Sequence, residues 1–174
     1  MNPQPSGVGP TGDPASAGGE SNLVVARYRN GQVIKGKTRD FFPERPLFHV
    51  LPQGGSQPVQ VKTAELKGVF FVRDLIGNRL RHKNRRFPAF DTGPQTGRRI
   101  AVLFDDGELL VGHSQTYSAE RPGFFVFPLD PYGNNTRVYV LRAATKEVRL
   151  GPGAEELSRT APPPKKRTPP AAAA

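Results

Sequence analysis

The chain of 174 residues contains no cysteine. This absence excludes disulfide bonds, zinc sites built from thiolates and a cysteine nucleophile. Long apolar runs are also missing, since no stretch approaches the roughly 18 apolar residues that a membrane-spanning helix needs. The N-terminus lacks the basic region followed by an apolar run that marks a signal peptide. We therefore expect a cytoplasmic protein with no membrane-spanning segment.

Motifs of catalytic and metal sites are sparse. His49, His82 and His113 are far apart in the sequence, and no H-x-x-x-H or H-E-x-x-H pattern occurs. Ser114 and Ser118 lack the glycines of a nucleophile elbow, and no glycine-rich phosphate loop is present. We predict a protein that is not an enzyme and that has no metal site and no cofactor.

Large apolar side chains are scarce at both ends of the chain. Residues 1–21 consist mainly of Gly, Pro, Ser and Asn, and residues 151–174 are rich in Pro and Ala. Neither end can bury enough apolar surface to offset the entropy lost on ordering it. We predict that both tails are disordered and that residues 22–150 fold.

An internal repeat dominates the part that remains. Residues 24–52 align with residues 100–128 without a gap at an offset of 76, and eight of the 29 positions are identical. With three extra residues in the second copy, residues 59–72 align with 138–150. The identical pairs are Gly31/Gly107, Gly36/Gly112, Glu44/Glu120, Arg45/Arg121, Pro46/Pro122, Phe48/Phe124, Val50/Val126 and Pro52/Pro128. The two copies are predicted to span 22–72 and 98–150.

Each copy has the pattern of five short β-strands. Asn30-Gly31 and Asp106-Gly107 are signals of two-residue hairpin turns of type I′, and the flanking residues alternate in polarity. Gly36 and Gly112 fall inside the returning strand, where a glycine marks a bulge or a sharp bend. Five short strands suit a small closed sheet. The predicted fold class is all-β: two tandem small antiparallel five-stranded barrel-like units packed together.

Two features of the copies leave alternatives open. The phenylalanines are expected to form a core that the two copies share, although exposed rings could instead stack on nucleic-acid bases. The repeated Glu-Arg-Pro segment, residues 44–46 and 120–122, is either a structural turn or a site where the copies pair with each other. The turn is the preferred interpretation, because proline restrains its own φ and the residue before it.

The positive charge is concentrated between the copies. The net charge is +10, and residues 73–99 carry eight Arg and Lys against two Asp. Arginine grips phosphate and carboxylate groups through paired hydrogen bonds, so this concentration predicts an anionic partner. The alternative is a solvated loop that keeps the protein soluble. The candidate binding residues, in the connection 73–97 and beside it, are Arg79, Arg81, Lys83, Arg85, Arg86, Arg98 and Arg99.

Some of these residues carry a family resemblance. The segment 81–85, with Arg at both ends, resembles the R-x-x-x-R motif ahead of the barrel in the PilZ family, which binds cyclic di-GMP. Residues 38–43 and 114–118 lie where that family carries D-x-S-x-x-G, but Phe42 and Thr116 replace the expected Ser and Asp. The resemblance implies that Arg81 and Arg85 clamp phosphate in a degenerate PilZ-like barrel. The opening of each copy is also similar to Sm and SH3-like barrels, and the two-copy arrangement looks similar to an uncharacterised bacterial domain related to signalling.

The sequence thus predicts a regulatory binding or adaptor protein. Its partner would be a cyclic dinucleotide or an acidic protein segment, engaged through the basic region between the repeats. One alternative is an Sm-like protein that binds RNA or DNA, and a second is a purely structural protein-interaction module. In each of these hypotheses the two copies form the scaffold, and the functional site lies at the junction between them.

Overall fold

The computed structural model describes residues 21–77, 85–89 and 97–163, which form one antiparallel sheet and a single α-helix. The strands are β1 (Asn22–Tyr28), β2 (Val33–Thr38), β3 (Leu47–Pro52), β4 (Val59–Lys62), β5 (Leu66–Val72), β6 (Arg98–Phe104), β7 (Leu109–Ser114), β8 (Gly123–Pro128), β9 (Asn135–Leu141) and β10 (Thr145–Leu150). The helical elements are the 3₁₀ turns η1 (Thr63–Glu65) and η2 (Arg142–Ala144) and the helix α1 (Pro152–Thr160).

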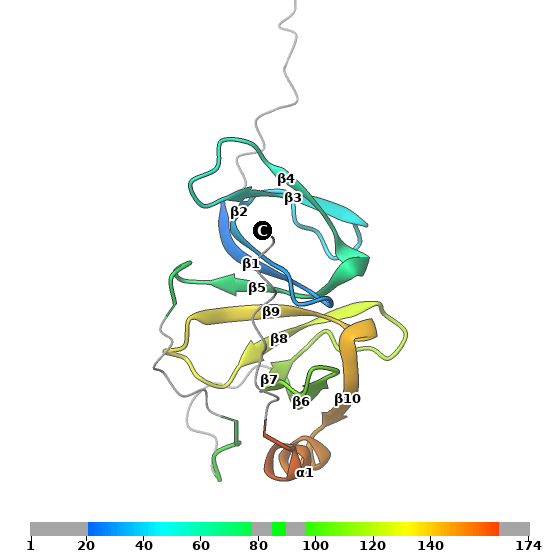
Figure 1. The fold of residues 1–174 in the computed structure, drawn as a ribbon. Coiled ribbons are helices and arrows are strands. Elements are labelled where there is room, and N and C mark those ends of the chain that lie inside the picture. Colours follow the sequence, from blue (N-terminus) through cyan, green and yellow to red (C-terminus); the bar gives the residue numbers. More distant parts are fainter. Residues whose placement is uncertain (1–20, 78–84, 90–96, 164–174) are drawn as a thin grey trace, which may run out of the picture.

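Strands β1–β5 and β6–β10 form two units of the same design, stacked on each other (Figure 1). Equivalent backbone hydrogen bonds recur in both. The N–H of Arg29 donates to the carbonyl oxygen of Glu65 at 3.1 Å, and the N–H of Asp105 donates to that of Ala144 at 3.0 Å. The predicted fold class, two tandem five-stranded units in an all-β protein, is confirmed.

One continuous sheet runs through both units. Its strand order is β10-β6-β7-β8-β9-β5-β1-β2-β3-β4, so the pairing of β5 with β9 joins the fifth strand of the first unit to the fourth strand of the second. β5 is buried along its whole length, as a strand between two units must be. The two units are therefore fused through backbone hydrogen bonds as well as through side chains.

The strands of each unit curl around a core of that unit, and each core also includes side chains from the other unit. The first core includes Tyr139 and Leu141 from β9, and the second includes Phe70 and Val72 from β5. The rings of Phe41 and Tyr139 meet edge-on across the junction, with centroids 5.4 Å apart. The expectation that phenylalanines build a shared core is confirmed for the buried rings, Phe48, Phe70, Phe71, Phe104 and Phe124, whereas Phe42 and Phe127 are exposed.

The two bend glycines occupy equivalent crowded positions. A Cβ on Gly36 would lie 2.0 Å from the carbonyl oxygen of Leu51, and a Cβ on Gly112 would lie 2.1 Å from that of Phe127. Only glycine allows the neighbouring strand to approach so closely. The predicted bend inside each returning strand is therefore real, and it lets each sheet curl.

The hairpin turns differ from the prediction. The N–H of Gly31 donates to the carbonyl oxygen of Tyr28, and the N–H of Tyr28 donates to that of Gln32. Gly31 has φ +93°. Every described residue with a positive φ is a glycine, so the φ of Asn30 is not positive. The type I′ prediction is wrong, because the connection has three residues with glycine in the left-handed position, a geometry that also fits the strand twist. Gly107, with φ +82°, repeats the arrangement.

The prediction that the chain is disordered from residue 151 is wrong for α1, whose residues 152–160 are helical. Ala154 and Leu157, three positions apart, pack on Ala101 and Leu103 of β6. Pro152 begins the helix, where its missing N–H costs nothing. Two apolar residues in a short polar helix give a weak sequence signal, and the stabilising surface comes from a distant strand. Residues 1–20 and 164–174 of the predicted tails lie outside the described residues.

Candidate functional site

The structure describes four of the seven predicted binding residues, namely Arg85, Arg86, Arg98 and Arg99. The other three, Arg79, Arg81 and Lys83, lie outside the described residues. The described parts of the connection, 73–77 and 85–89, show how each is fastened to the folded units.

The start of the connection is held by both units. In the loop between β8 and β9, the side chain of Asn134 accepts a hydrogen bond from the N–H of Asp74 at 3.0 Å and donates one to its carbonyl oxygen at 2.9 Å. From β2, Nζ of Lys35 donates to the carbonyl oxygen of Leu75 at 3.1 Å. The carboxylate of Asp74 accepts hydrogen bonds from the N–H groups of Ile76 and Gly77. These contacts fix the direction in which the chain leaves the first unit.

Residues 85–89 are held on the outer face of the second unit. The Phe87 ring packs on the cluster beneath α1, and the Arg99 guanidinium lies over this ring, 5.3 Å from its centroid. Arg99 also forms an ion pair with Glu155 of α1. Arg85 donates a hydrogen bond to the carbonyl oxygen of Pro162, just after the helix, at 3.1 Å. Arg85 and Arg99 therefore help to fasten the connection and α1 to each other.

Arg86 and Arg98 have a different environment. Both are exposed, and neither side chain forms a hydrogen bond or an ion pair with another described residue. They are the chain neighbours of Phe87 and Arg99, which contact each other, so the backbones of all four arginines lie close together on the second unit. The side chains of Arg98 and Arg99, which are consecutive in β6, point to opposite faces of the sheet. An exposed guanidinium keeps its full capacity to bind a carboxylate or a phosphate. We call Arg85, Arg86, Arg98 and Arg99 the arginine surface.

A charged network joins the two units beneath the junction. Nζ of Lys67, on β5, lies 2.6 Å from carboxylate oxygens of both Asp106 and Glu108 in the second unit. Glu108 also pairs with Arg27 at 2.9 Å, and Nζ of Lys67 lies over the Phe104 ring, 4.2 Å from its centroid. The Lys67 side chain is only 7% exposed. Two carboxylates and an aromatic face compensate for the burial of this charge.

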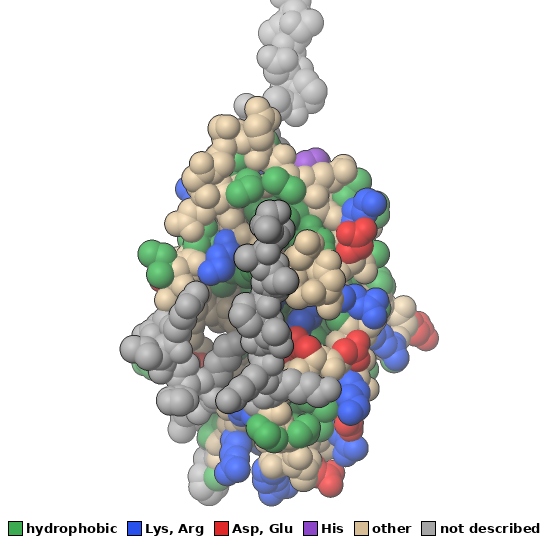
Figure 2. Space-filling model, in the orientation of Figure 1, with side chains coloured by type: hydrophobic (Ala, Val, Ile, Leu, Met, Phe, Trp, Pro, Cys, Tyr) green, Lys and Arg blue, Asp and Glu red, His purple; other side chains and the backbone are tan. Residues whose placement is uncertain are grey.

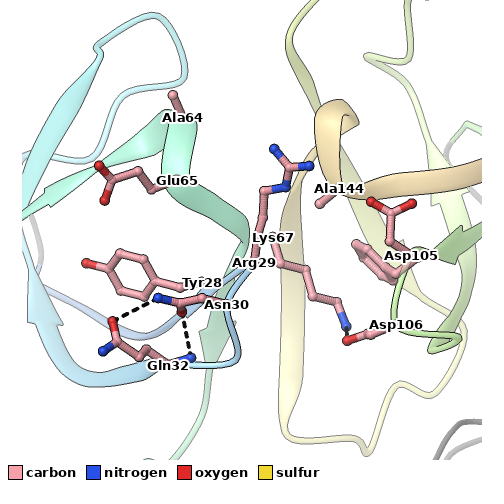
Figure 3. A pocket seen from close by; sticks show the side chains of 11 residues that line it. Tyr28, Arg29, Asn30, Gln32, Ala64, Glu65, Lys67, Asp105, Asp106 and Ala144 are labelled. Atoms are coloured by element: carbon pink, nitrogen blue, oxygen red, sulfur yellow. Dashed lines mark hydrogen bonds and ion pairs between the residues drawn. The ribbon is translucent and has the colours of Figure 1, made fainter.

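A groove of about 600 Å³ opens beside this network, between the hairpin turns of the two units (Figure 3). Tyr28 and Glu65 line it from the first unit, and Asp105 and Asp106 line it from the second. Figure 3 shows Lys67 extended toward Asp106, so its charge is already neutralised there. Arg29 is the other cation of the lining, against the carboxylates of Glu65 and Asp105, so the lining has a net negative charge and does not suit the predicted class of partner.

A smaller cavity of about 330 Å³ lies where the connection begins, between Asp74 and the start of β7. Its apolar lining includes Phe70 and Leu110, and its polar lining includes Glu108 and Asp130. Arg73 also lines the cavity, but the carboxylates of Asp74, Glu108 and Asp130 outnumber it and disfavour an anionic ligand. None of the arginine-surface residues lines this cavity or the larger groove.

The positions of the second PilZ-like motif serve the scaffold. Oδ1 of Asp40 accepts a hydrogen bond from the N–H of His49 at 2.9 Å, and Oγ1 of Thr116 accepts one from the equivalent N–H of Phe125 at 3.1 Å. The carboxylate of Asp40 also lies 2.7 Å from Nδ1 of His49. Partial burial raises the pKa of Asp40, but the hydrogen bonds from His49 outweigh it and leave this pKa below its usual value.

The repeated Glu-Arg-Pro segment is a turn. The carbonyl oxygen of Pro46 accepts a hydrogen bond from the N–H of Thr63 at 2.8 Å, and that of Pro122 accepts one from the N–H of Arg142 at 2.9 Å. Arg45 stacks on the Phe42 ring of its own unit, 4.7 Å from its centroid. The preferred interpretation of this motif is confirmed.

Metal-binding groups are absent from the described ranges, in which no three His, Cys, Asp or Glu side chains converge as metal ligands do. Among the same residues, no helix has the length and apolar character needed to cross a membrane. The buried His113 packs edge-on against Phe87, with ring centroids 6.4 Å apart.

The network around Lys67 was not predicted, although the sequence contains a signal for it. Asp106 and Glu108 align with Asn30 and Gln32, so only the second copy carries carboxylates in this turn. A charge that appears in one copy alone indicates a contact that only this copy makes.

Comparison with known proteins gives one match. The model of a family of unknown function (DUF6982) matches residues 20–151, which include both units. No curated protein and no solved structure matches the chain.

Proposed function

The chain belongs to the DUF6982 family, a family of unknown function, and from its own residues we propose that it is a non-enzymatic adaptor protein. Its partner is an acidic segment of another protein, which binds at the arginine surface of the second unit. The neighbouring Arg79, Arg81 and Lys83 add positive charge in the same connection.

One observation carries this proposal: the connection is fastened beside α1 by Arg85 and Phe87, while Arg86 and Arg98 remain exposed and unengaged among the described residues. A fastened backbone presents these cations without the entropy loss that a free loop would suffer on binding. Phe87, held between the cations, offers an apolar contact to the same partner.

An extended acidic segment fits this surface better than a cyclic dinucleotide does. Compact ligands bind in concave sites that bury most of their surface. The groove and the smaller cavity are lined by more carboxylates than cations, and none of the four arginines lines either of them. An acidic peptide needs no cavity, since carboxylates can pair with guanidinium groups along a convex surface.

Fluorescence anisotropy with a labelled peptide of alternating glutamate and serine tests the proposal. We expect the full chain to bind this peptide at low salt, and the double variant R86E/R98E to bind it about tenfold more weakly. Binding should weaken as the salt concentration rises, because the contacts lie at the surface.

A matched control separates a specific surface from net charge. The double variant R29E/R39E reverses two exposed cations of the first unit, so it has the same net charge as R86E/R98E. It should bind the peptide as the native chain does. Equal weakening by both double variants would reduce the effect to overall charge and would refute the proposed site.

A further inference from the structure

The two strands at the ends of the sheet each have one edge to which no described strand pairs. These strands are β4 and β10, and within the described residues each pairs with one neighbour only. β9, the counterpart of β4 in the second unit, pairs on its other side with β5. The outer edge of β4 is therefore the equivalent of the edge of β9 that pairs with β5, but no described strand pairs with the edge of β4.

A second copy of the chain does not fit this open surface by repeating the junction. Head-to-tail stacking would place β10 of one copy on β4 of the next. Gly68 of β5 corresponds to Glu147 of β10, since each follows a bulged lysine and pairs with an equivalent residue. A Cβ on Gly68 would lie 2.8 Å from the carbonyl oxygen of Tyr139, so the side chain of Glu147 cannot take this place.

The charges also oppose such stacking. Lys146 corresponds to the buried Lys67, and in a stacked copy it would meet Asn30 and Gln32 where Lys67 meets two carboxylates. A buried ammonium group without a carboxylate is strongly unfavourable. The chain therefore encodes the junction once, and the open surface has a different occupant.

The chemistry of this surface indicates the occupant. In the second unit the equivalent positions are the apolar Phe125, Tyr139 and Leu141, which pack on the first unit; here they are His49, Gln60 and Lys62. Leu47 and Leu51, on β3, and Val59, on β4, are each between 37% and 39% exposed. Lys37 lies opposite Leu51 on β2.

Figure 2 shows exposed hydrophobic side chains over the first unit, with Lys and Arg side chains nearby. The carboxylates closest to these strands are already engaged: Asp40 with His49, and Glu65 with Lys62 at 3.7 Å. The surface is therefore basic and apolar, and it borders a sheet edge whose backbone groups can accept another strand.

From these observations we infer that the β4 edge, with Leu47 and Lys62 beside it, binds an extended segment of a partner protein that alternates apolar and acidic residues. The segment adds to the sheet as β5 adds to β9, its apolar side chains contact Leu47, which lies opposite Lys62 in the register of β3 and β4, and its carboxylates pair with Lys62. This surface is separate from the arginine surface, so one chain can hold two partner segments.

Two labelled peptides test the inference directly. The first copies β5 with its flanks, residues 65–73, and carries the changes K67E and R73E; the second keeps both basic residues. Both keep the glycine that allows close approach. Anisotropy titrations of the full chain should show the acidic peptide binding about tenfold more tightly than the basic one.

The double variant L47D/K62E should weaken binding of the acidic peptide about tenfold. Its matched control is F127D/K146E, because Phe127 is an apolar residue of β8 that is 42% exposed, and Lys146 is an exposed lysine of the second unit. This control and R86E/R98E should both bind as the native chain does, which separates this surface from the arginine surface. A thermal melt of each variant establishes that it is folded.

Three results would overturn the inference. Equal affinity for the two peptides, or equal loss in L47D/K62E and F127D/K146E, would remove the specific strand site. A dimer in sedimentation velocity that L47D abolishes would assign the surface to a second copy. Pelleting of the chain with phosphatidylserine vesicles that depends on Leu47 would assign it to a membrane.

Discussion

Nζ of Lys67 in the first unit lies 2.6 Å from Oδ2 of Asp106 in the second. The lysine is bulged out of β5, and its counterpart Lys146 is bulged out of β10 but is exposed. The duplicated scaffold therefore places a lysine at the same point twice, and only the first lies where carboxylates of another unit can reach it.

The ion pairs of Lys67 should stabilise the junction. Replacement of Lys67 by Met keeps most of the apolar stem but leaves Asp106 without this cation and Glu108 with Arg27 alone. We expect a loss of about 3 kcal/mol in the free energy of unfolding, measured by urea denaturation. Lys146→Met is the matched control, and it should change stability by no more than about 0.5 kcal/mol. A similar loss in both variants would mean that the ion pairs contribute nothing specific.

The bend glycines should tolerate no side chain. Gly36→Ala and Gly112→Ala each place a Cβ within about 2 Å of a carbonyl oxygen of the next strand. The strand must move, and we expect a loss above about 4 kcal/mol or a failure to fold, visible in circular dichroism. Gly153→Ala, in α1, meets nothing closer than 3.5 Å and should stabilise the chain by about 0.5 kcal/mol. Soluble, stable protein from Gly36→Ala would contradict the bend.

Helix α1 should contribute to the stability of the second unit. Leu157 is 5% exposed and packs on the outer face of the sheet, so Leu157→Ala should cost about 2–3 kcal/mol in thermal or urea unfolding. Arg159→Ala, on the exposed side of the same helix, should cost less than about 0.5 kcal/mol. Equal stability of Leu157→Ala and the native chain would show that the helix does not pack as described.

The pair of Asp40 and His49 should add stability that depends on pH. The pKa of Asp40 is lower in the folded chain than in the unfolded chain, so folding favours its ionised form. The resulting stability is fully present above the unfolded pKa and is lost as the pH falls through the folded pKa. Urea unfolding should therefore show Asp40→Asn less stable than the native chain at neutral pH, with the difference shrinking in acid. Thr116→Val changes the equivalent position of the second unit, and the difference in stability between this variant and the native chain should not change with pH over the same range.

Much of the scaffold could be predicted from the repeat. The offset of 76 residues carries β1–β3 onto β6–β8, and the repeated Gly36 and Gly112 mark the bends. The fusion of the units through β5 and β9 could not be predicted, because each strand has the same local pattern whether or not an outer neighbour pairs with it. Helix α1 was missed because its stabilising surface lies on β6, about fifty residues away along the chain.

The candidate site was predicted only in outline. The concentration of arginines was visible in the sequence, but not which of them the fold would use for itself. Arg85 and Arg99 hold the connection and α1, while Arg86 and Arg98 stay exposed. This division depends on Phe87 and Glu155, which are brought to the arginines by tertiary contacts and not by spacing in the sequence.

Binding of an acidic protein segment at the arginine surface is tested most directly by calorimetric titration with three anionic probes at the same salt concentration. The probes are the alternating glutamate–serine peptide, cyclic di-GMP and a short DNA duplex. We expect heat from the peptide that R86E/R98E abolishes and R29E/R39E preserves, and no saturable heat from cyclic di-GMP. Saturable binding of cyclic di-GMP or DNA that is tighter than that of the peptide, or peptide binding that is unchanged in R86E/R98E, would contradict the claim.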